Sequence, residues 1–372
     1  MPVQAGDRYQ IESPQPLVAA LRQAGFRIVG PQASDGAIVY EELDSSQSLP
    51  RGLTDEQSGG HYRLKNGDPN RWFDYVVGPQ SWKKHLFPAH QKLWSAARTS
   101  DGFDINPSED EYPKTAFFGV RACEIAAMQI QDKVFDNGQF ADSGYGRRRA
   151  ATLIVAVQCA RSAETCFCAS MNTGPRADSG FDIALTELET GGFLVECGSE
   201  AGGVVLEGLA LSEATDADWD AAKAATDKAA AMQTRKMVGN VAEVLREHLD
   251  HPRWDEVADR CLSCANCTLA CPTCFCSDVE EVTDLSGEHA ERWRVWDSCF
   301  SLDFSYIHGG AVRTSTKSRY RQWMTHKLSS WHDQFDTSGC VGCGRCIAWC
   351  PVGIDITEEA EAMATPMETT EG

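Results

Sequence analysis

Two copies of one cysteine motif constrain this chain of 372 residues more than any other feature. The motif, C-x2-C-x2-C-x3-C-P, occurs as CLSCANCTLACP and again as CVGCGRCIAWCP. Three thiolates two residues apart can wrap around three corners of an Fe4S4 cube, while the fourth points away and reaches a second cube. The spacing therefore predicts two [4Fe–4S] clusters that exchange their fourth ligands. The first set is Cys261, Cys264, Cys267 and Cys350, and the second set is Cys340, Cys343, Cys346 and Cys271.

Two other metal groups fit the motif poorly. Structural zinc takes four ligands in paired C-x2-C units, which leaves no role for a third cysteine and a fourth before proline. A c-type haem requires histidine directly after a C-x2-C unit, and no such histidine occurs in the sequence. Inert buried thiols remain an alternative for a single motif, but two copies in one chain argue against chance.

Composition limits the compartment and the partners. The net charge of −20 argues against a nucleic-acid partner, whose phosphates need a basic footprint, and it disfavours an anionic membrane surface. The chain begins without a basic segment followed by an apolar run, and no stretch approaches the ~18–20 apolar residues of a membrane span. We therefore expect a cytoplasmic protein. Disulfides rarely persist in that compartment, so its 16 cysteines indicate metal binding or redox chemistry.

The first half of the chain reads as mixed α/β. The runs TAFFGV and TLIVAV lack alternation, as expected for strands buried on both faces. A helix is predicted over residues 17–24, a loop over 47–70, and a hairpin around Gly191 and Gly192. The predicted strands are residues 26–29, 37–40, 115–120, 152–157, 181–188, 193–197 and 204–206.

The overall prediction is an α+β chain in four parts. A mixed α/β domain over 1–215 precedes a helical linker over 216–255, where Thr215 and Asp218 form a weak capping box. A largely α-helical, ferredoxin-like domain with the two clusters follows over 256–356, because the 68 residues between the motifs include the helical pattern RYRQWMTHKLSSWHDQF. The acidic tail, 357–372, is predicted to be disordered.

Further cysteines follow the two buried strands. Loops after adjacent parallel strands meet at one edge of a sheet, so four thiols there would suffice for a third [4Fe–4S] cluster. The alternative is that they are small core residues. This third set is Cys123, Cys159, Cys166 and Cys168.

The remaining cysteines have weaker signals. Cys274, Cys276 and Cys299 could bind another metal, shield a cluster or simply pack, and Cys197 lies in a predicted strand and is read as structural. Residues 304–332 carry five basic side chains, Lys327 among them, and no acidic one. That segment is either a docking face, a source of positive charge that raises cluster potentials, or a solvated helix.

The chain lacks the glycine-rich phosphate loops of nucleotide sites and the nucleophile elbow of hydrolases. No catalytic residue and no flavin or nicotinamide site is therefore predicted in this chain. An electron relay without a terminal donor or acceptor is incomplete, so we expect partner subunits.

The motifs together resemble the family of sulfhydrogenase beta subunits and of the equivalent subunits in anaerobic sulfite reductases. The resemblance covers most of residues 110–356 and is carried by GVRACEIAAM, TCFCASMNTGPR, CLSCANCTLACPTCFC and RYRQWMTHKLSSWHDQFDTSGCVGCGRCIAWCPVGIDI. It implies a subunit with two ferredoxin-type [4Fe–4S] clusters beside a partner that carries FAD and handles NAD(P)H. In hydrogenase complexes the further partners that it implies are a small iron–sulfur and a large [NiFe] subunit. Ala122 departs from the family pattern, which has proline before the cysteine, and this weakens the third cluster.

Three functions remain open at this point. The first is an electron-transfer beta subunit of a cytoplasmic, NAD(P)-linked [NiFe] hydrogenase or sulfhydrogenase, an oxidoreductase component without a substrate-converting centre of its own. The second is the equivalent subunit of an anaerobic sulfite reductase, beside the other sulfite reductase subunits. The third, from another class, is a redox-sensing iron–sulfur regulatory protein.

Overall fold

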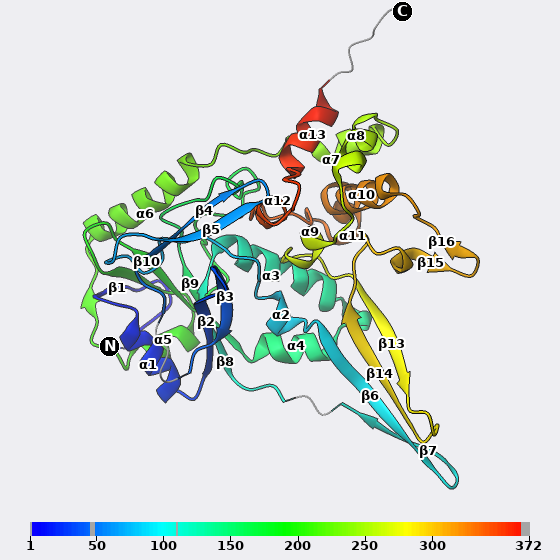
Figure 1. The fold of residues 1–372 in the computed structure, drawn as a ribbon. Coiled ribbons are helices and arrows are strands. Elements are labelled where there is room, and N and C mark those ends of the chain that lie inside the picture. Colours follow the sequence, from blue (N-terminus) through cyan, green and yellow to red (C-terminus); the bar gives the residue numbers. More distant parts are fainter. Residues whose placement is uncertain (1, 45–48, 109–110, 366–372) are drawn as a thin grey trace, which may run out of the picture.

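Eight strands form the central sheet of the chain, seen in the computed structural model that describes residues 2–44, 49–108 and 111–365 (Figure 1). Strands β10, β9, β8 and β2 run parallel, and antiparallel strands continue the sheet on both sides. In spatial order the strands are β12 (Ser212–Glu213), β1 (Arg8–Ile11), β11 (Phe193–Cys197), β10 (Ile183–Glu187), β9 (Thr152–Val157), β8 (Thr115–Val120), β2 (Arg27–Ser34) and β3 (Ala37–Glu42).

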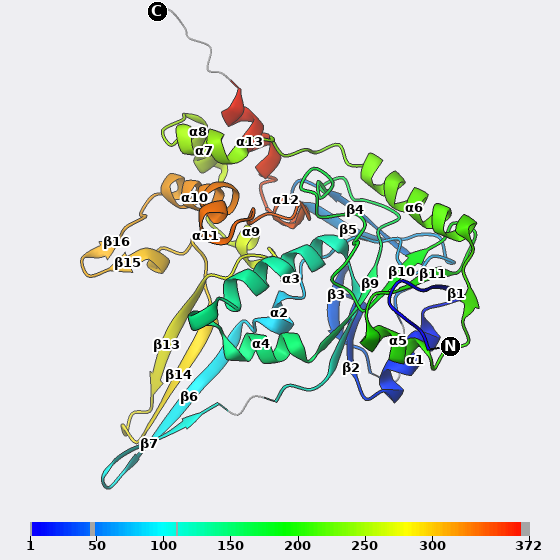
Figure 2. The ribbon, with the colours of Figure 1, turned by 180° about the vertical axis from the view of Figure 1, so that it is seen from behind.

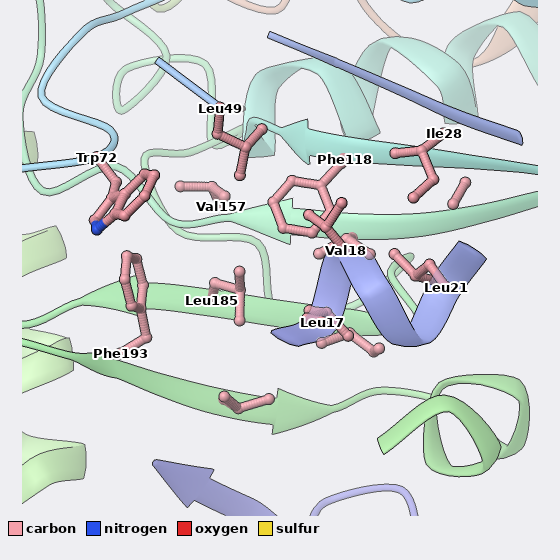
Figure 3. Packing of buried hydrophobic residues seen from close by; sticks show 14 of the residues in the cluster. Leu17, Val18, Leu21, Ile28, Leu49, Trp72, Phe118, Val157, Leu185 and Phe193 are labelled. Carbon is pink, nitrogen blue, oxygen red and sulfur yellow. The ribbon is translucent and has the colours of Figure 1, made fainter. Parts of the chain in front are cut away.

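Helices cover both faces of this sheet. On one face lie α1 (Gln15–Gln23) and α5 (Glu200–Leu206), and on the other lie α2 (Lys83–Leu86), α3 (Ala122–Phe135) and α4 (Ser143–Ala150) (Figure 2). Leu17 and Leu21 of α1 pack against Ile28 and Phe118 of the sheet (Figure 3). The parallel strands are buried on both faces, as their continuous apolar runs predict.

The C-terminal part is a second core built mainly from short helices. Trp254, Tyr320, Trp323 and Met324 are buried at its centre. The helix α6 (Asp216–Ala231) leads to it and begins with the predicted capping box of Thr215 and Asp218. The later elements are α7 (Val241–Glu247), α8 (Arg253–Arg260), α9 (Asn266–Leu269), α10 (Thr316–Thr325), the short π-helix η3 (His326–Ser330), α11 (Trp331–Phe335), α12 (Arg345–Ala348) and α13 (Ile356–Ala364), with a small hairpin of β15 (Tyr306–Ile307) and β16 (Gly310–Ala311).

A four-stranded arm joins the two halves of the chain and projects from the body (Figure 1). It pairs β6 (His90–Thr99) and β7 (Gly102–Pro107) with β13 (Ser277–Thr283) and β14 (His289–Trp296). Strand β14 aligns with β6 from His289 opposite Ala97 to Val295 opposite His90, so the two predicted domains share one sheet.

Four sequence predictions differ from the structure. Residues 53–66 of the predicted loop form the hairpin β4 (Leu53–Ser58) and β5 (His61–Asn66), while 47 and 48 lie outside the described residues. The buried side chains of β4 include Asp55 and Gln57, so no apolar alternation marks the strand. Residues 204–206 belong to helix α5, because the Ser199 side chain caps it by accepting from the Gly202 amide.

The other two differences lie in the C-terminal part. The largely helical domain contains the β13–β14 hairpin, whose second strand HAERWRVW alternates in sequence only over residues 292–295. The prediction of a disordered tail is wrong for residues 357–364, which belong to α13. Asp355 caps this helix, and Met363 and Glu359 are buried on one side of it. The α+β class with mixed sheets and helices is confirmed. Within the described residues, none of the helices has the length and apolar character needed to cross a membrane.

Candidate iron–sulfur centres

The first set of cysteines lines one apolar pocket. Cys261 ends α8, and the loop after it turns through left-handed residues Ser263 (φ 50°) and Ala265 (φ 65°). These turns fold the loop back so that its three thiols face Cys350, which arrives from beyond α12. All four thiols border the pocket together with Cys346 of the second motif, and its other walls include Phe300, Tyr320 and Trp323. Four thiols around an apolar pocket are the donor set of a [4Fe–4S] cluster.

The four thiols of the second set also lie close together, and the fourth of them, Cys271, comes from the first motif. Burial raises the pKa of the Cys346 thiol well above its usual value, and the thiols of Cys340, Cys343 and Cys271 raise it further because they lie close by. The Gly342 amide lies 3.4 Å from Cys340 Sγ and donates to it. Each motif thus brings its first three thiols together with the fourth cysteine of the other motif, and the two sets form two separate sites.

Lys327 is a buried cation beside the second set. Its Nζ lies 3.3 Å from Cys271 Sγ and donates also to Thr273 Oγ1 and the Gly339 carbonyl, both at 3.1 Å. Burial alone would lower the pKa of Lys327, but the nearby side chains of Cys271, Cys274 and Cys340 raise it well above its usual value, because negative charge on their sulfur atoms favours the ammonium. The ammonium therefore stays charged and serves as counter-ion to the thiolates.

The third set lies at the carboxyl edge of the parallel strands. Cys123 follows β8 at the start of α3, and Cys159, Cys166 and Cys168 lie in the loop after the neighbouring strand β9. Burial raises the pKa of Cys166 well above its usual value, and the thiols of Cys168 and Cys159 add to the rise. Cys168 in turn is close to Cys123, so the four thiols gather at this edge.

The third set is next to the second. Cys123 and Cys168 pack with Cys343 in one buried cluster, and the Phe167 amide donates to the Gly342 carbonyl at 2.9 Å. Among the described residues, no group of three or more His, Cys, Asp and Glu side chains is arranged to hold a single metal ion. The donor groups present are thiols, the ligands of iron–sulfur clusters.

Residues 260–354 match the 4Fe–4S dicluster domain family. Sulfhydrogenase 2 subunit beta of Pyrococcus furiosus is 35% identical over 246 residues, which make up 65% of this chain and 72% of that protein. The chain belongs to the sulfhydrogenase beta-subunit family. The predicted resemblance, the C-terminal dicluster domain and the role of an iron–sulfur electron-transfer protein are thereby confirmed.

Three more thiols of this family member gather in a separate pocket. Cys274, Cys276 and Cys299 border it together with Lys327 and Trp331. The Cys276 and Cys299 thiols are hydrogen-bonded, and this bond lowers the pKa of Cys276 to about 7. Their role as metal ligands stays a prediction. Cys197 lies apart in β11, where its thiol donates to the Ser199 carbonyl at 3.3 Å.

Sequence reasoning missed two cations that the fold brings to these centres. Lys83 of α2 is buried, and its Nζ donates to the Cys274 carbonyl at 3.0 Å and lies 3.9 Å from the centre of the Trp296 ring. Arg345 of the second motif is buried against Glu124, which follows Cys123. Neither residue has a local signal, since their partners are 191 and 221 positions away. Of the basic segment 304–332, Lys327 is buried at a centre, while Lys317 and Arg321 bind surface carboxylates.

Proposed function

We propose that this chain is the electron-transfer beta subunit of a cytoplasmic, NAD(P)-linked [NiFe] hydrogenase of the sulfhydrogenase type. It relays single electrons between a subunit that carries FAD and binds NAD(P)H and the hydrogenase side, a small iron–sulfur and a large [NiFe] subunit. The name of the Pyrococcus furiosus relative favours this function over a role in a sulfite reductase and over a regulatory protein.

The observation that carries the proposal is the exchange of cysteines between the two motifs. Cys350 lies in the pocket of the first motif, and Cys271 lies among the thiols of the second. The two ligand sets therefore interlock, so that two clusters would be held side by side. When bound, such clusters supply reversible one-electron redox chemistry.

The protein's own contribution is ligation, burial and hydrogen bonding to sulfur. The Ser263 and Ile354 amides donate to Cys261 Sγ at 3.4 Å and Cys350 Sγ at 3.3 Å. Such bonds stabilise the negative charge on the ligand sulfur atoms and so set the potential at which an electron is accepted. The apolar walls exclude water from the same atoms.

The first set offers the edge at which a partner would exchange electrons. Cys264 is exposed, and Leu262 beside it is 63% exposed. The rate of electron transfer falls steeply with the distance between two redox centres. A partner must therefore approach a cluster ligand that reaches the surface. An exposed apolar rim around such a ligand is suited to protein contact. We place the contact with a partner subunit here.

We further propose that the third set binds a third [4Fe–4S] cluster. Its thiols lie next to Cys343 of the second set, which would extend the relay towards the α/β domain. Gln233 Nε2 donates to Cys168 Sγ at 3.2 Å, and Arg121 Nη1 lies 3.8 Å from Cys159 Sγ, so polar groups already face two of these sulfur atoms.

The test is the metal content of the protein purified anaerobically with its partners. About eight irons per chain are expected for two clusters and about twelve for three. Cys346→Ser should remove about four irons and interrupt NAD(P)H-linked electron flow, since it deletes one ligand of the second set. Cys197→Ser replaces a buried cysteine outside all three sets and should leave both unchanged. Wild-type iron content and activity in Cys346→Ser would contradict the ligand assignment.

A further inference from the structure

Cys276 and Cys299 form a thiol pair that neither of the two motifs uses. Cys276 directly precedes β13 and Cys299 follows β14, and these two strands pair with Ser277 opposite Trp296. Beyond that pair the Asp297 amide donates to the Cys276 carbonyl at 2.9 Å. The backbone of the hairpin therefore holds the two cysteines together without any need for a metal.

The contact between the two thiols is direct. They are hydrogen-bonded to each other, whereas the ligands of a cube are spread over its separate iron atoms. A disulfide needs two sulfur atoms about 2.05 Å apart, a separation that two neighbouring thiols reach by turning towards each other.

The surroundings suit a reactive pair. Both cysteines are half-buried and border a small pocket, so protons and solvent can reach them. The charged ammonium of Lys327 borders the same pocket, and a nearby cation stabilises the thiolate form through which thiols react. Apolar walls from Trp323 and Trp331 complete the pocket.

The pocket is also next to the second set. The Cys274 thiol borders the pocket and is hydrogen-bonded to Cys271, which belongs to the second set. Lys327 also connects the pocket to the second set, since it borders the pocket and its Nζ lies 3.3 Å from Cys271 Sγ. Cys274 and Lys327 therefore connect the pocket that holds Cys276 and Cys299 to a cluster ligand.

We propose that Cys276 and Cys299 are a redox-active dithiol–disulfide couple that exchanges electrons with the dicluster domain. On oxidation the two S–H bonds break and one S–S bond forms. Two protons leave to solvent through the half-buried pocket, and two electrons leave one at a time towards the second set. Reduction reverses each of these changes. The couple would link one-electron transfer along the relay to two-electron thiol chemistry. The electron route rests on the proposed function, but the thiol pair does not.

Trapping the thiols at controlled potential tests the pair. The holoprotein is equilibrated anaerobically with redox mediators over a series of potentials, alkylated with iodoacetamide, digested and analysed by mass spectrometry. A disulfide-linked Cys276–Cys299 peptide should appear at the oxidising end and vanish at the reducing end along a two-electron curve. Cys276→Ser should abolish this peptide with the iron content intact, while Cys274→Ser, which alters the same pocket, should keep it.

Two results would contradict the proposal that Cys276 and Cys299 form a redox couple. One is alkylation of both thiols at every potential at which the clusters survive. The other is a loss of iron in Cys276→Ser, which would make Cys276 a cluster ligand. The route is tested separately in Cys346→Ser, where a disulfide formed by a chemical oxidant should be reduced at least tenfold more slowly by NAD(P)H and the flavin partner. An unchanged rate of disulfide reduction in this variant would contradict the proposed electron route but not the proposed thiol pair.

Discussion

Arg345 and Glu124 form an ion pair in which both side chains are buried, with Arg345 Nη2 2.6 Å from Glu124 Oε1. Arg345 lies between two cysteines of the second motif, and Glu124 follows Cys123 of the third set. The same guanidinium donates to the carbonyls of Gly78 and Gln80, both at 2.9 Å. One side chain thus anchors the second motif to the α/β domain.

Removing the charge of Glu124 should destabilise the protein strongly. Breaking a buried pair by removing one partner leaves the other charge uncompensated, which costs about 3–5 kcal/mol. Because glutamine keeps the shape and can still accept one hydrogen bond, we expect Glu124→Gln to cost about 3 kcal/mol. The measurement is the free energy of unfolding from anaerobic denaturant titration.

An exposed ion pair supplies the control. Glu56 pairs with Lys65 at the surface, where 56% and 54% of the two side chains are exposed. Surface pairs contribute little because solvent screens them, so Glu56→Gln should leave the free energy of unfolding nearly unchanged. Equal effects of the two substitutions would show that the buried pair has no special role.

The charge of Lys327 should raise the potential of the cluster held by the second set. Reduction adds negative charge to the cluster and its thiolates, and a nearby cation that bonds to Cys271 stabilises that added charge. Lys327→Met keeps a chain of similar length without charge, so one cluster should become harder to reduce. The readout is a redox titration followed by electron paramagnetic resonance, with iron content measured to verify that both clusters remain.

Lys317→Met is the matched control for this change. Lys317 lies in the same basic segment but binds Asp255 at the surface. Its loss should leave both cluster potentials unchanged. A Lys327→Met protein with wild-type potentials would mean that solvent or other groups compensate the missing charge.

The sequence alone revealed the parts whose signal is local. Motif spacing predicted a dicluster domain because each motif brings three ligands within seven residues, and strands such as Thr115–Val120 were visible as apolar runs. Adjacency of the loops after β8 and β9 also followed from strand order, which the parallel pairing of these strands confirms.

The missed features depend on contacts between distant residues. Hairpin β4–β5 buries polar Asp55, which accepts hydrogen bonds from the Val76 amide and from Arg161, so no hydrophobic pattern announced it. The tail helix α13 buries Glu359 between Arg253 and Arg260, and in sequence this residue reads as part of a solvated acidic run. Long-range ion pairs of this kind turn a polar segment into a packed one.

A substitution of Gly342 should be poorly tolerated, because the loops that carry the second and third cysteine sets pack against each other at its Cα. Its φ is +63°, and an added Cβ would lie 2.6 Å from the Cys168 amide nitrogen and 2.7 Å from the Phe167 carbonyl carbon. Backbone on both sides cannot move away without shifting ligands of the second and third sets. Gly342→Ala should therefore lower the free energy of unfolding by about 2–5 kcal/mol, from about 1–2 kcal/mol of strain plus about 1–3 kcal/mol of overlap, and should also reduce the iron content.

Gly36→Ala separates strain from overlap in that experiment. Gly36 has a similar φ of +74°, but an added Cβ there meets nothing within 4 Å. This variant should lose only the strain contribution of about 1–2 kcal/mol and keep its full iron content. Equal losses in the two variants would mean that close packing around Gly342 is unimportant.

His85 should make the protein less stable as the pH falls below neutrality. Burial lowers its pKa to about 4, with Lys84 adding to the shift, and its ring Nε2 donates to the Tyr40 carbonyl at 3.3 Å. The unfolded chain has a histidine pKa of about 6.5, so between these values it takes up a proton that the folded protein does not.

The stability that His85 contributes is present above the unfolded pKa and is lost as the pH falls from about 6.5 towards 4. Between pH 7.5 and 5.5 the loss should be about 1.4 kcal/mol. His85→Gln can still donate to the Tyr40 carbonyl but cannot be protonated, so its free energy of unfolding should fall by about 1.4 kcal/mol less over this interval than that of the wild type. Anaerobic denaturation of both proteins at the two pH values measures the difference, in which the acid sensitivity of the clusters cancels. Parallel losses in wild type and variant would mean that His85 is already solvated, or already protonated, in the folded protein.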